Sequence, residues 1–266
     1  MKLLLYIYFF IMFLSKNKVI LSFKNIIFKK PPIFREHSNK MTDFLQDKKL
    51  ISISPGGFRG FYMFGVGKFI KENYDLEKFI FSGASAGSWV SLFLCYRGNI
   101  DDIKNILFTK DLKELKSIIE MENTVRTRIL TNFKTEDFDL KRLFVGVSVL
   151  KGFKFNTIIY SDFVSLEDAI NCCIASSHIP FITGGMNNKY NNIYSYDGGF
   201  SEYPYLDGIE PVLHIMPNLW NKTHDTVDCR EFTSLFSKNK YNFTKLIDDG
   251  YLHSLENKEY IDKILL

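Results

Sequence analysis

The chain of 266 residues is 46% hydrophobic and 16% aromatic, which suffices for one substantial core and is typical of a single α/β domain. Its net charge of +4 is uneven: residues 1–40 carry eight basic residues and one acidic residue, a net +7, so the remainder carries −3. The body shows no basic stripe with interleaved aromatics, which argues against a nucleic-acid partner. An anionic membrane surface suits the basic segment better.

The N-terminal segment, residues 1–48, is expected to be distinct from the body at residues 49–266. An apolar run covers residues 3–14, whereas a transmembrane helix needs about 20 apolar residues. The run fits a secretory signal, although no small-x-small cleavage site follows it, and it fits an interfacial anchor equally well. A dispensable extension is the third interpretation. We expect membrane association through this segment, with secretion as the alternative.

The four cysteines are Cys95, Cys172, Cys173 and Cys229. Two are adjacent, and the spacing suits neither a zinc site nor a disulfide framework. We therefore interpret them as buried thiols, which favours a reducing compartment.

The body is predicted to begin with a strand at residues 50–54, followed by a glycine-rich loop at residues 55–60 and an apolar helix at residues 61–70. Such a loop exposes backbone N–H groups at a helix N-terminus, where they can bind a phosphate or the oxyanion of a tetrahedral intermediate. Neither a Walker loop nor a dinucleotide fingerprint is present, so a nucleotide phosphate is the weaker interpretation.

A second strand, turn and helix follow. Residues 78–81 are typical of a short buried strand, residues 88–96 of a mostly apolar helix, and Gly83-Ala84-Ser85-Ala86-Gly87 lies between them. A serine at a strand-to-helix turn with very small neighbours is the pattern of a nucleophile elbow. An ordinary glycine-rich turn is the alternative. Because the helix N-terminus points at Ser85, it would favour negative charge developing there.

The rest of the body fits a compact α/β layout. Residues 101–131 have helical patterning and are a candidate cap over the site, or else ordinary packing helices. Residues 143–149 and 157–160 are predicted strands, residues 166–176 a helix, and residues 243–266 one or two further helices.

Four segments, in this order, resemble the patatin-like phospholipase family. Gly56-Gly57-Phe58-Arg59-Gly60 resembles its oxyanion loop, and the turn at Ser85 resembles its nucleophile elbow. Residues 175–181 resemble the segment that precedes its aspartate, and Asp197-Gly198-Gly199 resembles its Asp-Gly-Gly or Asp-Gly-Ala turn. The ordered set is far more specific than any single motif, and the resemblance covers roughly residues 49–204.

The resemblance implies a three-layer α/β/α sandwich and a Ser-Asp dyad that works without histidine. Ser85 would be the nucleophile and Asp197 the base, with Gly83 and Gly87 forming the elbow. A serine hydroxyl needs such a base, because it is a poor nucleophile while it keeps its proton. No metal or cofactor is required by these parts.

By the same resemblance, backbone N–H groups around Gly56, Gly57 and Phe58 would form the oxyanion hole. Arg59 and Gly60 would support this loop, or Arg59 would meet a phospholipid phosphate. The alternative for Arg59 is a solvated loop residue.

Histidine bases and departures from the family pattern also bear on the site. His214, His224 and His253 follow Asp197, so a Ser-Asp-His triad is compatible with their order, although none lies in a recognisable catalytic turn.

Pro55 stands where a further glycine is frequent. Glu202 replaces a common asparagine, which leaves the support of the Asp197 turn open.

These observations predict a phospholipase A type acyl hydrolase that cleaves glycerophospholipid esters through an acyl-enzyme. Alternatives with the same dyad are a neutral-lipid lipase and an acyltransferase. A non-catalytic lipid-binding membrane protein is the alternative from another class.

Overall fold

The computed structural model describes residues 33–34, 44–151, 154–200, 206, 209–220 and 241–266. Most of the predicted N-terminal segment lies outside these residues, as do Glu202, His224 and Cys229. The boundary near residue 48 therefore stays a prediction. Among the described helices, none combines the length and apolar character that crossing a bilayer requires.

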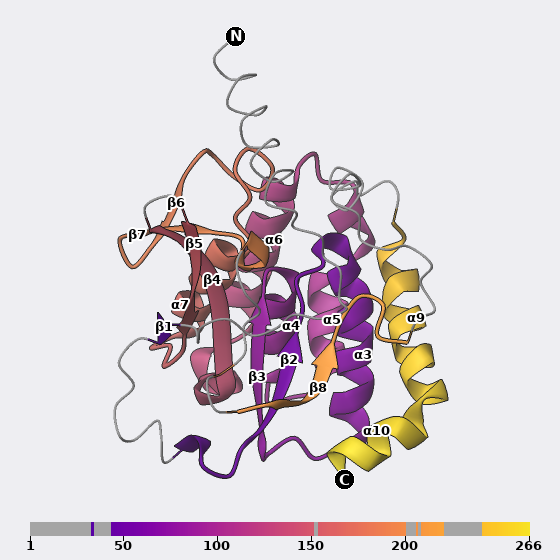
Figure 1. Cartoon of the computed structure of the whole chain (residues 1–266). Coiled ribbons are helices and arrows are strands. Elements are labelled where there is room, and N and C mark those ends of the chain that lie inside the picture. The colour runs from indigo at the N-terminus through magenta and orange to yellow at the C-terminus, as the bar shows by residue number, and fades with distance from the viewer. Residues whose placement is uncertain (1–32, 35–43, 152–153, 201–205, 207–208, 221–240) are drawn as a thin grey trace.

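A mixed sheet forms the centre of the molecule (Figure 1). The strand order is β1 (Ile33–Phe34), β5 (Lys154–Tyr160), β4 (Leu143–Lys151), β3 (Phe79–Ala84), β2 (Lys49–Ile53) and β8 (Pro211–Ile215). Strands β8, β2, β3 and β4 run parallel to one another, whereas β5 is antiparallel to β4. Strand β7 (Ile193–Tyr196) pairs with both β4 and β6 (Asn188–Tyr190). The parallel strands bring the loops after β2 and β3 to the same edge.

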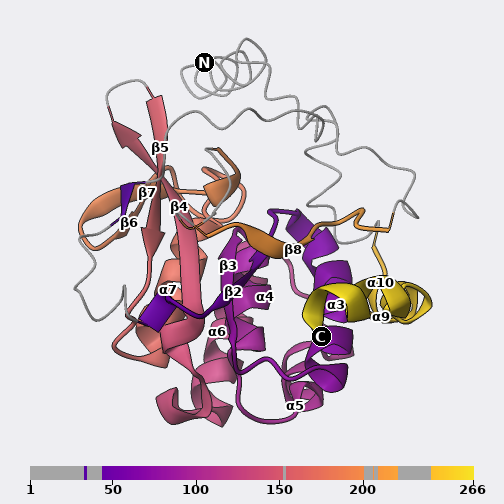
Figure 2. The same ribbon diagram turned by 60° about the horizontal axis from the view of Figure 1, so that its bottom comes forward.

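The longer helices gather on one side of the sheet (Figure 2). They are α3 (Gly60–Asn73), α4 (Ala86–Leu94), α5 (Ile100–Leu107), α6 (Ile118–Asn132), α7 (Leu166–Ser176), α9 (Phe243–Glu256) and α10 (Lys258–Leu265). Polar residues cap several of them. Ser165 accepts from the backbone N–H of Asp168 at the start of α7, and Ser117 does the same for Glu120 at the start of α6.

The strands are apolar on both faces, as a buried sheet requires. One face, with Ile51, Phe81 and Val145, packs against the helices in the large core. The other face is covered by a thinner layer that includes a helical turn at Phe44 and Leu45. A mixed sheet between two covering layers confirms the predicted α/β sandwich.

Two glycines let helices α3 and α9 approach closely. A Cβ added at Gly65 would lie 2.0 Å from the carbonyl oxygen of Ile247, and one at Gly250 would lie 2.1 Å from that of Tyr62. Gly67, on the same helix, would meet only side-chain atoms at 3.4 Å. The close approach of α3 and α9 therefore requires glycine at these two positions.

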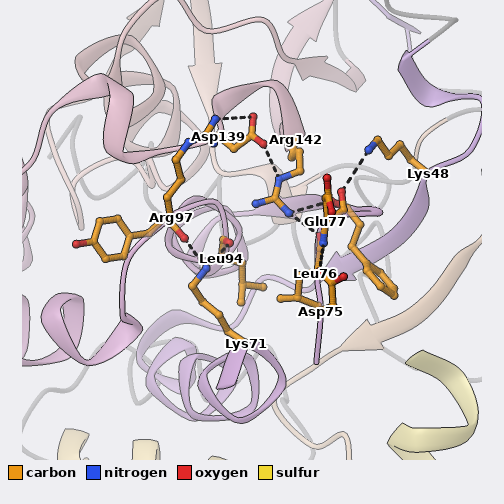
Figure 3. Close-up of polar contacts among 11 residues, drawn as sticks. Lys48, Lys71, Asp75, Leu76, Glu77, Leu94, Arg97, Asp139 and Arg142 are labelled. Atoms are coloured by element: carbon orange, nitrogen blue, oxygen red, sulfur yellow. Dashed lines mark hydrogen bonds and ion pairs between the residues drawn. The ribbon is translucent and has the colours of Figure 1, made fainter. Parts of the chain in front are cut away.

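A polar cluster lies at the end of the sheet where β3 begins, which is the end opposite to the turn between β3 and α4 (Figure 3). Arg142 donates to the carbonyl oxygen of Leu76 at 2.6 Å and pairs with Asp139 at 3.1 Å. Lys71 donates to the carbonyl oxygens of Leu94 and Tyr96, which lie at the end of α4 where backbone carbonyl groups have no partner within the helix.

Cys95, Cys172 and Cys173 are free and buried, as predicted.

Candidate active site

Ser85 lies at the turn between β3 and α4, where the sequence predicts a nucleophile elbow. Ser85 has φ 53° and ψ −128°, a conformation that costs energy for a non-glycine residue and must be enforced by its surroundings. A Cβ at Gly83 would lie 2.2 Å from the carbonyl oxygen of Gly87, and a Cβ at Gly87 would lie 2.3 Å from that of Ile53. The small residues around Ser85 are therefore required by backbone packing.

The structure places Ser85 against Asp197. The Ser85 hydroxyl donates a hydrogen bond to Oδ2 of Asp197 at 2.6 Å, and both residues are only 5% exposed. The other carboxylate oxygen, Oδ1, accepts from the backbone N–H of Gly199 at 2.7 Å. The backbone N–H of Asp197 donates to the carbonyl oxygen of His178 at 2.7 Å. Serine and carboxylate are thus held in the geometry that a proton transfer requires.

Burial tunes the acidity of the carboxyl group. It raises the pKa of Asp197 to about 6, although the hydrogen bonds from Ser85 and from the N–H of Gly199 act in the opposite direction. At neutral pH the group is an ionised carboxylate with a higher proton affinity than an ordinary aspartate. Such a group is matched to accepting a proton from a hydroxyl.

The glycine loop lies beside the serine. Gly57 has φ 52°, in the left-handed region that favours glycine, and it begins a short 3₁₀ helix, Gly57–Arg59. A Cβ at Gly60 would lie 2.8 Å from the Cβ of Ala86, so the loop contacts the residue after Ser85. Arg59 is only 5% exposed, which excludes a solvated loop arginine. Gly57 and Phe58 line the same pocket as Ser85.

That pocket is a mainly apolar cavity of about 160 Å³. Aromatic side chains dominate its walls, and its lining includes Phe61, Phe64, Trp89, Phe93 and Phe108. Helix α6 supplies a further wall, so part of the predicted cap region does border the site. Trp89 donates its indole N–H to the hydroxyl of Ser177 at 3.0 Å, which fixes the ring. The cavity suits a hydrocarbon chain attached to an ester at Ser85.

The described histidines do not bond to Ser85. His214 shares a hydrogen bond of 2.9 Å with Ser54, and burial lowers its pKa to about 4. His253 bonds to the hydroxyl of Tyr62 at 3.1 Å. A base for Ser85 would be a carboxylate or an imidazole group. Among the residues that the structure describes, the carboxylate of Asp197 is the group of this kind that is hydrogen-bonded to the Ser85 hydroxyl. Pro55, the residue at which the glycine loop departs from the family pattern, lies close to the Asp197 turn. A Cβ added at Gly199 would be 3.2 Å from the Cβ of Pro55.

Comparison with known families gives a match over the part of the chain that contains Ser85 and Asp197. The family model for patatin-like phospholipases matches residues 51–208, which is more than half of the chain and spans β2, the glycine loop, the elbow and Asp197. The chain belongs to the patatin-like phospholipase family. Within this patatin-like domain, the match runs from the strand before the glycine loop to just beyond the turn at Asp197.

Other comparisons add little. A search of curated proteins gives no match. Among solved structures, this patatin-like protein is similar to a chain of the heterodimeric ExoU-SpcU complex from the type III secretion system of Pseudomonas aeruginosa. The identity is 12% and the TM-score is 0.34, with 79% of this chain and 52% of that chain covered. The protein therefore spans about half the length of that chain.

Two residues at the site were not predicted from the sequence. Ser176 accepts a hydrogen bond from the backbone N–H of Ser85 at 2.8 Å and donates to the carbonyl oxygen of Gly146 at 2.6 Å. Its segment was singled out by resemblance, yet a serine near a helix end gave no sign of this role. Glu122 lines the cavity from α6. The available signal was a carboxylate that interrupts the apolar spacing of Ile118, Met121 and Val125.

Proposed function

We propose that this protein is a lipid acyl hydrolase of phospholipase A type. The observation that carries the proposal is the 2.6 Å hydrogen bond from Ser85 to Asp197 beside an apolar cavity. Membership of the patatin-like phospholipase family supports the lipid substrate. Glycerophospholipids are the proposed class, and the acyl chain would occupy the cavity.

The proposed reaction has two stages. Ser85 Oγ attacks the ester carbonyl while its proton passes to Asp197, and the N–H groups of the glycine loop stabilise the oxyanion. The alcohol leaves with the proton that Asp197 returns. A water molecule then gives a proton to Asp197 and attacks the acyl-enzyme, and the fatty acid is released as Ser85 regains its hydrogen. Each proton moves only between Asp197 and a group bonded or adjacent to it.

The test is release of free fatty acid from phospholipid vesicles and from triglyceride emulsions, by the wild type and by Ser85→Ala. The proposal expects release from phospholipid that Ser85→Ala abolishes. Release from triglyceride alone would make the protein a neutral-lipid lipase. Acyl chains that pass to an added alcohol would make it an acyltransferase, and lipid binding without any release would make it a non-catalytic lipid-binding protein.

We also propose that the basic N-terminal segment brings the enzyme to an anionic membrane surface. The support is its charge of +7 over residues 1–40 and the apolar run within it. Co-sedimentation with vesicles should increase with the fraction of anionic lipid and fall at high salt. Equal binding to neutral vesicles would contradict this part of the proposal.

A further inference from the structure

Large apolar side chains are exposed along the stretch of chain that links the pocket to Asp197. Ser177 and Thr183 line the pocket beside Ser85, and the chain then runs through the β6–β7 hairpin to Asp197. We call residues 178–196 the rim segment. Its exposed large apolar side chains, which are 41–55% exposed, are Phe181, Met186, Ile193 and Tyr194.

Phe181 is exposed in a backbone conformation that its side chain disfavours. Its φ of 66° lies in the left-handed region, where a bulky residue is an outlier. A glycine or an asparagine would adopt this φ at a lower cost. Burial of the ring does little to offset the cost, because Phe181 is 50% exposed. The stability of the fold therefore does not account for a phenylalanine at this position.

The first part of the rim segment is braced from inside. The hydroxyl of Thr183 accepts the backbone N–H of Ile179 at 2.8 Å and donates to the carbonyl oxygen of Ser177 at 2.9 Å. The imidazole of His178, which is only 4% exposed, packs closely against Gly184, where an added Cβ would lie 3.0 Å from the ring. A braced loop therefore holds the apolar side chains outward.

The second part of the rim segment lies at the same end of the sheet as the turn between β3 and α4. Strand β3 ends opposite Gly146 of β4, and β7 pairs with β4 beyond this point, at Ser148 and Val149. Because β7 is antiparallel to β4, Ile193 and Tyr194 lie further out still (Figure 1). The whole rim segment is thus at the end of the molecule where the pocket lies.

The charge of the rim segment suits a lipid surface. Lys189 is its one residue among the Asp, Glu, Lys and Arg types, and its ammonium group lies 4.6 Å from the ring centroid of Tyr194. Aromatic rings and lysines are typical of protein segments at the headgroup level of membranes. The segment carries no carboxylate that anionic lipid would repel. By contrast, the exposed Leu255 of α9 is followed directly by Glu256.

We propose that the rim segment docks on the lipid bilayer, with Phe181 and Met186 inserted among the acyl chains beside the pocket. This inference rests on the proposed function, since it assigns the pocket beside Ser85 to an acyl chain. The chain then passes from the bilayer into the apolar pocket without crossing water, which would be unfavourable for a hydrocarbon. A second copy of this chain is the competing occupant of the surface.

The first arm of the experiment measures insertion into the bilayer without catalysis. Phe181→Trp is made in the full chain that also carries Ser85→Ala. It is mixed with vesicles of equal parts phosphatidylcholine and phosphatidylglycerol, with or without bromine on the acyl chains. Leu255→Trp in the same background is the control, because Leu255 is also half exposed but lies on α9. The signal of the parent chain, which contains Trp89 and Trp220, is subtracted.

Vesicles should shift the emission of Phe181→Trp to the blue, and brominated lipid should quench it, while Leu255→Trp changes little. Equal quenching of the two probes, or quenching of neither, would overturn the inference. An emission shift of Phe181→Trp that follows protein concentration in the absence of vesicles would show a second copy on this surface, and would overturn it as well.

The second arm compares hydrolysis of vesicle phospholipid with that of a soluble ester, p-nitrophenyl butyrate. In the double variant Phe181→Asn, Met186→Gln, the rate on vesicles should fall about tenfold, since two apolar contacts with lipid are lost. The rate on the soluble ester should stay unchanged, and the control Leu252→Gln, Leu255→Gln should change neither rate. Equal losses on both substrates would overturn the inference. Failure of the proposed function has a different signature, namely hydrolysis that persists in Ser85→Ala.

Discussion

The hydroxyl oxygen of Ser176 accepts the backbone N–H of Ser85 at 2.8 Å. The same hydroxyl donates to a carbonyl oxygen of β4, so one side chain links the strained turn after β3 to the neighbouring strand and to the end of α7. The backbone N–H of Ser85 is therefore already hydrogen-bonded within the fold. Stabilisation of the oxyanion is left to other N–H groups, which agrees with the proposed role of the glycine loop.

Ser176→Ala should therefore weaken both activity and stability. The change leaves a buried N–H and a buried carbonyl oxygen without a partner, at about 1–3 kcal/mol. We expect kcat to fall about tenfold, because the nucleophile is less well oriented. The matched control is Ser52→Ala in β2, since the Ser52 hydroxyl is buried and has no hydrogen-bond partner among the described residues. Similar losses in both variants would contradict the positioning role of Ser176.

The activity should depend on the ionisation of Asp197. With its pKa raised to about 6, the carboxylate that accepts the serine proton is present above this pH and is protonated below it. For an uncharged ester, kcat/KM should rise about tenfold per pH unit below pH 6 and level off above it. A profile that is flat between pH 4.5 and 8 would show that Asp197 is not the base.

The same raised pKa should make the folded protein less stable as the pH rises, whereas the activity should increase. In the unfolded chain an aspartate has a pKa of about 3.9, so Asp197 binds its proton more tightly in the folded protein. The stability that this bound proton provides is lost as the pH rises towards and through 6. Asp197→Asn cannot ionise. Its free energy of unfolding should exceed that of the wild type, and this advantage should grow by roughly 1 kcal/mol between pH 5 and pH 8. Urea denaturation at the two pH values measures the difference, and an advantage that does not grow with pH would contradict it.

Two glycines of α3 provide a test of helix packing. Gly65→Ala should be strongly destabilising, because its Cβ would overlap a carbonyl oxygen of α9. Gly67→Ala should raise the melting temperature, because its Cβ meets only movable side-chain atoms and alanine favours the helix by about 0.8–1 kcal/mol. Thermal unfolding of the two variants gives the comparison. Equal shifts would mean that α3 and α9 are not packed as described.

The sequence predicted the parts of the fold that depend on local patterns. Strands β2, β3 and β4 and helix α7 were evident from apolar periodicity, and the motifs at Ser85 and Asp197 singled out two residues that the structure joins by a hydrogen bond. Pairing was less visible, because the short strands β6 and β7 depend on contact with β4 rather than on their own residues. Ser176 was missed for a related reason. Its role arises from the backbone groups that lie opposite it in space, and no spacing along the chain encodes them.

The central claim, that Ser85 is a nucleophile activated by Asp197, is tested most directly by covalent labelling with a fluorophosphonate. Mass spectrometry should locate the adduct on the peptide that contains Ser85, and Ser85→Ala should give none. Labelling of Asp197→Asn should be slower by a factor of about 10²–10⁴, the usual contribution of a general base. An adduct on another residue, or an unchanged labelling rate in Asp197→Asn, would contradict the account.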